Sequence, residues 1–441
     1  MGKSTLLEEA APPSGGLLFE GLEQGGLRAQ VEHFTDQLAQ QTRSAPVRAT
    51  NWKDAFDALS PHLARGRRYV VFDEFPWMAS GQTQLVSLLK FYWDRVWKKN
   101  PRLTLVLCGS VASFMVEHVL HSSALHNRKT FELKVDPLPA PEARQFFKGL
   151  RGDVEVAKFL MLLGSVPKYL EQVDPRESLA ANMDRLCFTK NGFFVNELET
   201  IFKEQFKVVR TYEAIVASLA RGGRSREQLA ASLGKVPGGG LGRYLENLER
   251  ADFIKTFAPV SLDNGKGSKT RRHVLWDEWL RFYFTYMQPN LAAIRANTAR
   301  GLFDSLTASS VESYFGLAFE RLCMRNIESL LKSLAISAHE TLGYGPFFRQ
   351  PPRKGRAPAE GLQVDILIRR RGDVLTLVEC KFTSSPVDTS VIREVERKVA
   401  LLGAPRRYTV ERVLISANGV TPALQQRAYF HRTLGLDCLL P

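Results

Sequence analysis

The chain has 441 residues, of which 44% are hydrophobic and 24% are charged, and its formal net charge is +14. This length predicts about two to four domains, and the composition excludes a disordered or fibrous chain. No apolar run reaches the roughly 18 residues that cross a bilayer, and no two of the five cysteines have the spacing of a zinc or disulfide motif. We therefore expect a cytoplasmic protein without a membrane partner, and the positive charge favours a polyanionic partner such as DNA.

Residues 1–137 alternate between short apolar runs and helical patterns. Strands are predicted at 17–19, 69–72 and 103–107, and the intervening segments have helical periodicity. Alternation of this kind predicts a parallel sheet covered by helices, so the fold class is α/β.

The rest of the chain divides into three further regions. Residues 138–208 are predicted to be helical throughout. Residues 209–290 contain three helical segments followed by a Gly/Lys-rich hairpin candidate, which is the pattern of a winged helix. Residues 291–441 predict a second α/β domain, with these helices and strands in chain order: helix 311–331, strands 364–368 and 375–381, helix 390–402, strand 412–416 and a helix from Pro422.

The first residues match the end of a phosphate-binding loop. Gly2, Lys3, Ser4 and Thr5 fit the last positions of the pattern G-x-x-x-x-G-K-[ST] and are predicted to contact ATP. In such a loop the lysine contacts the β/γ-phosphates and the serine hydroxyl binds Mg²⁺. The first glycine of the pattern and its preceding strand are absent, so we expect the natural start to lie upstream, and ATP binding by this chain stays open.

Three further positions support a nucleotide site. Asp73 and Glu74 follow an apolar strand, as in a Walker B arrangement, where the Asp holds Mg²⁺ and the Glu polarises the attacking water. Ser110 ends the next strand and is a candidate contact to the γ-phosphate, with helix capping as the alternative. Arg128 is a candidate for stabilising charge in the transition state, with simple solvation as the alternative.

Residues 221–273 have a surplus of six positive charges. Basic side chains in a winged helix can contact the phosphate backbone of DNA. The alternative is a protein–protein spacer. The predicted DNA-binding residues are Arg224, Arg226, Arg243, Lys266, Lys269, Arg271 and Arg272.

The C-terminal region carries a spaced set of carboxylates. Thirteen residues separate Asp365 from Glu379, and Lys381 follows two positions later, which is the PD-(D/E)xK nuclease pattern. Glu379 and Lys381 share one face because side chains on a strand repeat every two residues. Asp365 and Glu379 are therefore predicted to hold a metal ion, with Lys381 positioning water and Glu320 as a further metal ligand. Retained cleavage and a binding role without cleavage are both open.

Taken in order, several segments resemble the archaeal-type AAA-family P-loop ATPases, which are related to STAND and origin-recognition ATPases. The resemblance implies a helical lid, a winged helix and a C-terminal DUF234 region with a restriction-endonuclease-like domain. It departs from that family at the incomplete loop and at Asn127, where the family usually has glycine. The segments that carry it are 2–7, 71–78, 107–110, 164–170, 191–197, 276–284 and 288–290.

Two functions follow as competing interpretations. The first is an ATPase that is coupled to DNA binding or processing. The second is a STAND-type regulatory switch that self-associates with nucleotide and whose C-terminal domain binds partners without cleavage. A fragment made inactive by its shortened loop is a third interpretation.

Overall fold

The computed structural model describes residues 2–12, 16–110, 114–206, 208–234, 239–258, 271–349 and 361–441. The chain forms two compact units. The first comprises Met1–Asp136 and Lys203–Lys207, and the second comprises Pro137–Phe202 and Val208–Pro441. No helix in the described ranges combines the length and apolar character that a bilayer crossing requires. The predicted subdivision of residues 138–441 into three domains stays a prediction.

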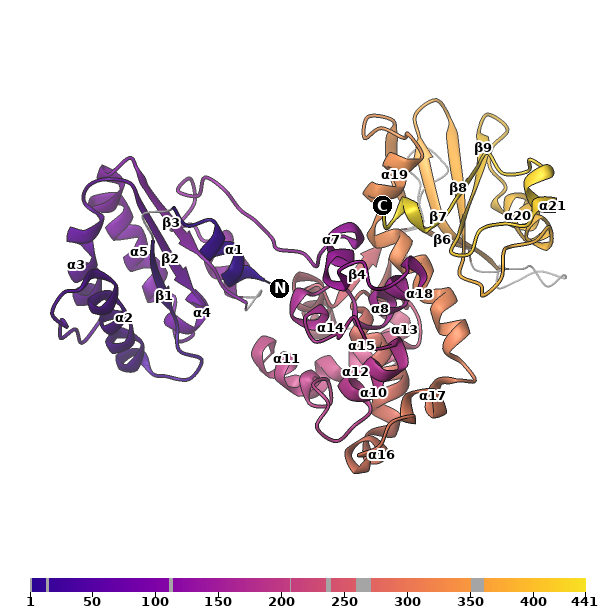
Figure 1. The fold of residues 1–441 in the computed structure, drawn as a ribbon. Helices are drawn as coiled ribbons and strands as arrows, with labels where there is room; N and C mark the ends of the chain where they lie inside the picture. Colours follow the sequence, from indigo (N-terminus) through magenta and orange to yellow (C-terminus); the bar gives the residue numbers. More distant parts are fainter. Residues whose placement is uncertain are drawn as a thin grey trace. The chain divides into compact units, whose positions relative to one another are not determined.

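The first unit is built on a parallel sheet in the order β1-β2-β3. All three predicted strands are confirmed, as β1 (Leu17–Glu20), β2 (Arg68–Asp73) and β3 (Leu103–Leu107). Figure 1 shows α2, α3 and α5 on one face of this sheet and α1 on the other. The helices of this unit are α1 (Lys3–Glu9), α2 (Leu27–Thr42), α3 (Trp52–Leu63), α4 (Phe75–Met78) and α5 (Gln84–Arg95).

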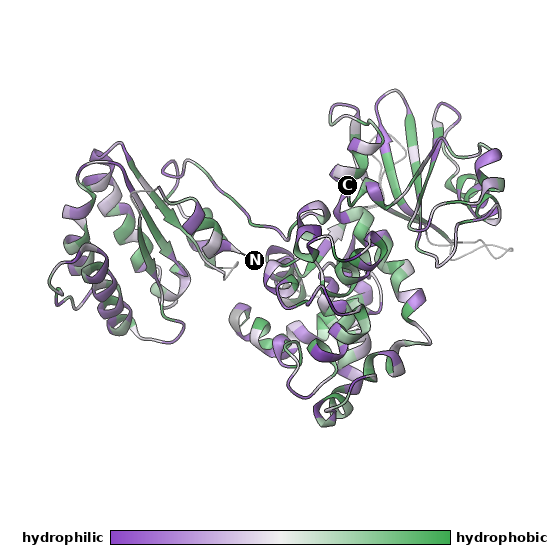
Figure 2. Ribbon diagram, viewed as in Figure 1, coloured by the Kyte–Doolittle hydropathy of each residue, from purple (hydrophilic) through white to green (hydrophobic). Residues whose placement is uncertain are grey.

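Aromatic side chains fill the space between this sheet and its helices. Phe19 of β1 stacks on Phe34 of α2 with ring centroids 4.1 Å apart, and Phe56 of α3 stacks on Phe72 of β2 at 5.9 Å. Phe56 is 1% exposed. In Figure 2 the strands are hydrophobic, whereas the outer surface of α2 is hydrophilic. The apolar runs of the sequence are therefore placed in a dry core, which fixes the sheet against α2 and α3.

The second unit begins with helices, as predicted. Three helices and an antiparallel pair of strands then follow, and Arg224 forms a bridge to His273 of the second strand. These elements match the order of helices and strands predicted for residues 209–290, while the Gly/Lys-rich turn predicted between the strands lies outside the described residues. Helix α11 (Glu197–Gln205) ends in the segment that belongs to the first unit. The other helices and strands of this stretch are α7 (Ala140–Arg144), α8 (Asp153–Leu163), α9 (Pro167–Leu170), α10 (Leu179–Cys187), α12 (Val209–Ala220), α13 (Arg226–Ser232), α14 (Gly239–Arg250), β4 (Ile254–Phe257) and β5 (Arg272–Leu275).

A buried ion pair ties the segment after β5 to a long helix further along the chain. Glu278, in α15 (Glu278–Phe282), accepts hydrogen bonds from Arg321 at 2.8 to 3.0 Å and lies 3.7 Å from Arg325. Glu278 is 3% exposed. Because a buried carboxylate without a partner costs several kcal/mol, on the order of 3–5, this contact fixes α15 against α18 (Val311–Arg325).

The C-terminal part contains a mixed sheet in the order β10-β9-β8-β7-β6. Strands β6, β7 and β8 are antiparallel, whereas β8, β9 and β10 are parallel. Apolar residues of α20 pack with those of β7 and β8 in one core cluster. The elements are α16 (Leu291–Ala296), α17 (Leu302–Thr307), α19 (Ile327–Ser333), β6 (Thr341–Arg349), β7 (Leu362–Arg370), β8 (Val374–Lys381), α20 (Ser390–Leu402), β9 (Thr409–Ser416), α21 (Pro422–Gln426) and β10 (Arg432–Leu434).

Three features of this part differ from the prediction, and one of them is the short edge strand β10, which was not predicted. The helix predicted over 311–331 is interrupted at Asn326, whose side chain accepts a hydrogen bond from the Ala140 amide at 2.8 Å and donates one to the Leu322 carbonyl at 2.9 Å. Strand β6 was not predicted. It contains two glycines and a proline, residues that weaken a strand pattern, and it lies at the edge of the sheet, where they are tolerated.

We expect Phe56→Ala to lower the free energy of unfolding of the first unit by about 3–5 kcal/mol, since it leaves a cavity among packed rings. Denaturant unfolding followed by tryptophan fluorescence measures the change, because Trp52 and Trp97 both contact the Phe56 ring. Phe91→Ala is the matched control: Phe91 is 51% exposed, and its loss should cost no more than about 0.5 kcal/mol. Equal effects of the two changes would contradict the described packing.

Candidate functional site

The carboxyl ends of the parallel strands bring the predicted nucleotide residues of the first unit together. Asp73 ends β2, and the start of α1 lies beside it: the Ser4 hydroxyl donates a hydrogen bond to Asp73 Oδ2 at 2.9 Å. The other oxygen, Oδ1, accepts the Glu74 amide at 2.9 Å. In open α/β sheets this edge is where ligands bind. The structure therefore places the loop remnant and the acidic pair at one location.

Glu74 and Ser110 form a second contact at the same edge. Glu74 Oε2 accepts hydrogen bonds from the Ser110 amide at 3.1 Å and the Ser110 hydroxyl at 2.8 Å. Glu74 has a left-handed backbone, with φ of 46°, a conformation that costs on the order of 1–3 kcal/mol. A Cβ on Gly109 would lie 2.5 Å from Pro76 Cδ, so glycine is required where β3 passes the chain after Glu74. The local backbone thus fixes the direction of the Glu74 carboxylate.

The remaining loop residues lie at the start of α1. Gly2 has a φ of 72°, and Lys3 is half-buried, with an ammonium group that makes no hydrogen bond or ion pair with the described residues. Burial, followed by the charge of Asp73, raises the pKa of the neighbouring Cys108 thiol to about 12, so this cysteine stays protonated. Hydroxyl and carboxylate oxygens are ligands that Mg²⁺ prefers. The oxygens of Ser4 and Asp73 therefore fit the predicted ion, and Gly2, Lys3 and Thr5 are positioned beside them.

Arg128 has a partner within the first unit. Its guanidinium donates to both carboxylate oxygens of Asp94 on α5, at 2.8 Å each, and this contact lowers the pKa of Asp94 to about 2. The predicted role of Arg128 at a γ-phosphate stays a prediction, and the observed contact secures the segment after β3 to α5.

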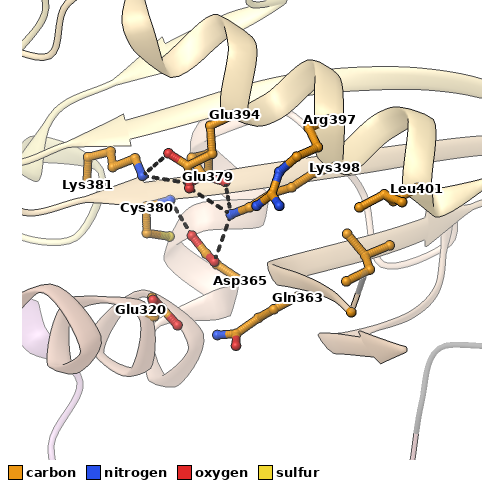
Figure 3. A pocket seen from close by; sticks show the side chains of 12 residues that line it. Glu320, Gln363, Asp365, Glu379, Cys380, Lys381, Glu394, Arg397, Lys398 and Leu401 are labelled. Carbon is orange, nitrogen blue, oxygen red and sulfur yellow. Dashed lines mark hydrogen bonds and ion pairs between the residues drawn. The ribbon is translucent and has the colours of Figure 1, made fainter. Parts of the chain in front are cut away.

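A second site lies in the C-terminal sheet. Ile366 of β7 is paired with Val378 of β8, so the next residues outward on the two strands are Asp365 and Glu379. The Cys380 amide donates to Asp365 Oδ2 at 2.8 Å. Figure 3 shows both carboxylates beside a cavity of about 290 Å³. The hairpin register therefore brings the predicted pair together, and Glu320 of α18 also lines the cavity.

Two lysines neutralise these carboxylates. Lys381 Nζ lies 2.9 Å from Glu379 Oε1 and 2.7 Å from Glu394 Oε2. Lys398 Nζ lies 2.6 Å from Glu379 Oε2 and 3.5 Å from both Asp365 Oδ1 and Glu394 Oε1. The predicted same-face placement of Glu379 and Lys381 is confirmed. Glu394 and Lys398 were not predicted as site residues, although Lys398 falls in the apolar face of α20, which is an unusual position for a lysine.

Burial controls the protonation of the acidic groups. Burial, followed by the charge of Asp365, raises the pKa of Glu379 to about 7 and that of Glu320 to about 8. Burial lowers the pKa of Lys398, but the charges of Asp365 and Glu379 outweigh it, and the net pKa is raised. Lys398 is therefore a cation at neutral pH, while Glu320 is largely protonated and makes no hydrogen bond or ion pair with the described side chains.

The predicted metal roles of Asp365, Glu379 and Glu320 do not fit this arrangement. In the part of the chain that the structure describes, no group of three or more His, Cys, Asp or Glu side chains is arranged to hold a metal ion. The Lys398 ammonium contacts Asp365 and Glu379 on the oxygens that a shared ion would use (Figure 3). A lysine thus stands where the prediction placed a divalent ion.

The predicted DNA-binding residues differ in exposure. Arg243 and Arg271 are exposed, whereas Arg224, Arg226 and Arg272 are half-buried. Arg224 Nε donates to the Ser218 carbonyl at 3.1 Å, and the Arg272 guanidinium lies 4.9 Å from the centre of the Phe348 ring. Lys266 and Lys269 lie outside the described residues. Arg243 and Arg271 are therefore the most exposed of the described members of this set, and their contact with DNA stays a prediction.

No family model matches the chain. Its sequence is 27% identical over 304 residues to an uncharacterized protein of Methanocaldococcus jannaschii, and the match covers 68% of this chain and 65% of that protein, less than two thirds of its length. A Walker-type ATPase of Pyrococcus abyssi has a TM-score of 0.45 and 19% identity, over 64% of this chain and 88% of that chain. The Cdc6p protein of Pyrobaculum aerophilum has a TM-score of 0.28 and 12% identity, over 67% and 85%. The interpretation of both sites rests on their own residues.

We expect Glu320→Gln to make the stability of the second unit less dependent on pH. The folded-state pKa of Glu320 is about 8, above its ordinary 4.5, so its contribution is full below pH 4.5 and is lost as the pH rises through 8. Between pH 5 and pH 8.5 the variant should therefore lose about 1–3 kcal/mol less than the wild type. Denaturant unfolding at both pH values measures this difference.

The control for this prediction is Glu312→Gln, which changes an exposed glutamate on the same helix. It should leave the difference between the two pH values as it is in the wild type. If Glu320→Gln and the wild type lose the same free energy of unfolding between pH 5 and pH 8.5, the pKa of Glu320 is not raised in the folded chain.

Proposed function

We propose that the first unit binds and hydrolyses ATP with Mg²⁺. The observation that carries this proposal is the 2.9 Å hydrogen bond from the Ser4 hydroxyl to Asp73, two residues that are 69 positions apart. A phosphate-binding loop and a Walker B strand bring these two residue types together around Mg²⁺. Neither motif by itself predicts this contact between Ser4 and Asp73.

Each residue at this edge then has a separate role. Lys3 contacts the phosphates, and Ser4 and Asp73 hold Mg²⁺, which offsets phosphate charge when it is bound. Glu74 orients and polarises the attacking water, while Ser110 fixes the direction of the Glu74 carboxylate through two hydrogen bonds. Catalysis at this site would consist mostly of positioning the attacking water. Glu74 suits this role because neutral donors hold its carboxylate in one direction.

We propose that ATP turnover is coupled to DNA through a winged helix formed by α12, α13, α14 and the β4–β5 pair. The order of these elements and the exposure of Arg243 and Arg271 support this assignment. The alternative is a STAND-type switch, in which nucleotide controls self-association. DNA-stimulated ATP turnover would favour the first function, and nucleotide-dependent self-association that is indifferent to DNA would favour the second.

We also propose that the C-terminal pocket is a nuclease-like site that contacts phosphodiesters. The convergence of Asp365, Glu379 and Lys381 on one cavity supports it. Because Lys398 occupies the position between the two carboxylates, the described arrangement does not support a metal-dependent reaction step. Binding of DNA without cleavage satisfies the same geometry.

We expect Glu74→Gln to reduce ATP hydrolysis by about 10²–10³-fold, since the variant removes the group that polarises water. ATP binding should change little, whereas Ser4→Ala should weaken Mg²⁺-dependent binding. Both are measured with the full chain, by phosphate release and by titration with a fluorescent ATP analogue. Glu32→Gln is the control, because Glu32 is exposed and pairs with Arg28 on α2. Absence of Mg²⁺-dependent nucleotide binding in the wild type would overturn the proposed function.

We expect the double change Arg243→Ala, Arg271→Ala to weaken DNA binding at all sequences. If each arginine contacts one phosphate, the plot of log binding constant against log salt concentration should become less steep, its negative slope shrinking in magnitude by about 2. Fluorescence anisotropy with a labelled duplex at several salt concentrations measures the slope. Arg28→Ala removes an exposed arginine of the first unit and should leave it unchanged. An unchanged slope in the double variant would remove these arginines from the DNA contact.

A further inference from the structure

The C-terminal pocket holds more ionisable groups than the predicted motif contains. Asp365, Glu379 and Glu394 supply three carboxylates, and Lys381 and Lys398 supply two ammonium groups. Asp365 and Glu379 are 7% and 1% exposed. Two buried carboxylates on neighbouring strands need a cation between them. Without it, their mutual repulsion would favour the protonated form of one carboxylate or destabilise the fold.

The position of Lys398 differs from that of Lys381. Lys381 contacts Glu379 Oε1 and Glu394, its side chain is 25% exposed, and it makes no ion pair with Asp365 in the described ranges. Lys398 contacts the other oxygen of Glu379 and also Asp365, and its side chain is 10% exposed. Lys398 therefore bridges the two carboxylates that face each other across the hairpin.

The helix that carries Lys398 holds it in place. Val391, Val395 and Leu402 lie at helical spacing from Lys398 and are buried in the same core cluster as β7 and β8. The aliphatic part of the Lys398 side chain thus starts from the apolar face of α20, and its ammonium group contacts the carboxylates of the pocket. Lysine is well suited to this, since its flexible stem can bury while its charge reaches a partner.

We propose that the Lys398 ammonium is the resident cation of this pocket and that it competes with divalent metal ions for Asp365 and Glu379. The inference rests on the proposed nuclease-like site, and it states what keeps a divalent ion away from the two carboxylates. With Lys398 in place the pocket excludes a divalent ion. Removing the charge of Lys398 turns the same carboxylates into a metal site.

The test measures Mn²⁺ binding to the full chain by the electron paramagnetic resonance signal of free Mn²⁺. Lys398→Met should bind one additional Mn²⁺ at least about ten-fold more tightly than the wild type, which corresponds to about 1.4 kcal/mol. Lys398→Arg keeps the charge and should bind as weakly as the wild type. Lys381→Met removes the same charge from the outer side of Glu379 and should give a smaller gain than Lys398→Met.

Two further measurements locate the gained site and check the fold. Adding Asp365→Asn to Lys398→Met should abolish the additional Mn²⁺ site. Mn²⁺ should raise the Tm of Lys398→Met and not that of the wild type, since a ligand stabilises the state that binds it. If Lys398→Met does not fold, Lys398→Gln, whose amide can bond to Glu379, serves in its place with the same expected gain.

The proposal is overturned if the folded variant binds Mn²⁺ within two-fold of the wild type, or if the gained site survives Asp365→Asn. Cleavage of a DNA duplex by the Mn²⁺-loaded variant is measured separately. A gained metal site without cleavage upholds the role of Lys398 and leaves DNA binding without cleavage as the function of the pocket. Cleavage without a gained metal site contradicts the role of Lys398 alone.

Discussion

The need to neutralise buried carboxylates constrains the second unit. Asp365 and Glu379 lie on adjacent strands of a sheet that is packed against α20, where an unpaired charge costs several kcal/mol, on the order of 3–5. Lys381 on β8 and Lys398 on α20 supply the positive charges that offset this cost. The identities of residues on β7, β8 and α20 are therefore coupled, because replacing one charge leaves its partner buried alone.

The first unit treats its acidic groups differently. Asp73 and Glu74 are half-buried, and their described partners are hydroxyls, backbone amides and the Cys108 thiol rather than lysines or arginines. Among the described residues, no lysine or arginine forms an ion pair with either carboxylate. The two acidic sites of the chain stand in opposite electrostatic states: the one beside Ser4 has the oxygens and the charge to receive a cation, and the one beside Lys398 already contains a cation.

The sequence predicted the parts of the structure that depend on local patterns. The strands of the first unit and the pair Asp365 and Glu379 follow from apolar runs, and the hairpin register then fixes which residues are opposite. The partner of Arg128 is Asp94, 34 positions away, and no local pattern marks such a contact. Lys398 was missed because a lysine in a helix is ordinarily assigned to solvent, although its spacing from Val391 and Val395 placed it on the apolar face.

Two neighbouring residues of α18 connect the two polar clusters of the second unit. Glu320 lines the C-terminal pocket, and the next residue, Arg321, is bound to Glu278 just after β5. Adjacent residues of a helix point in directions about 100° apart, so one rigid turn can serve both sites. Arg272 of β5 adds a contact to Phe348 of β6. A displacement of α18 would therefore alter the surroundings of Glu320 and Glu278 together.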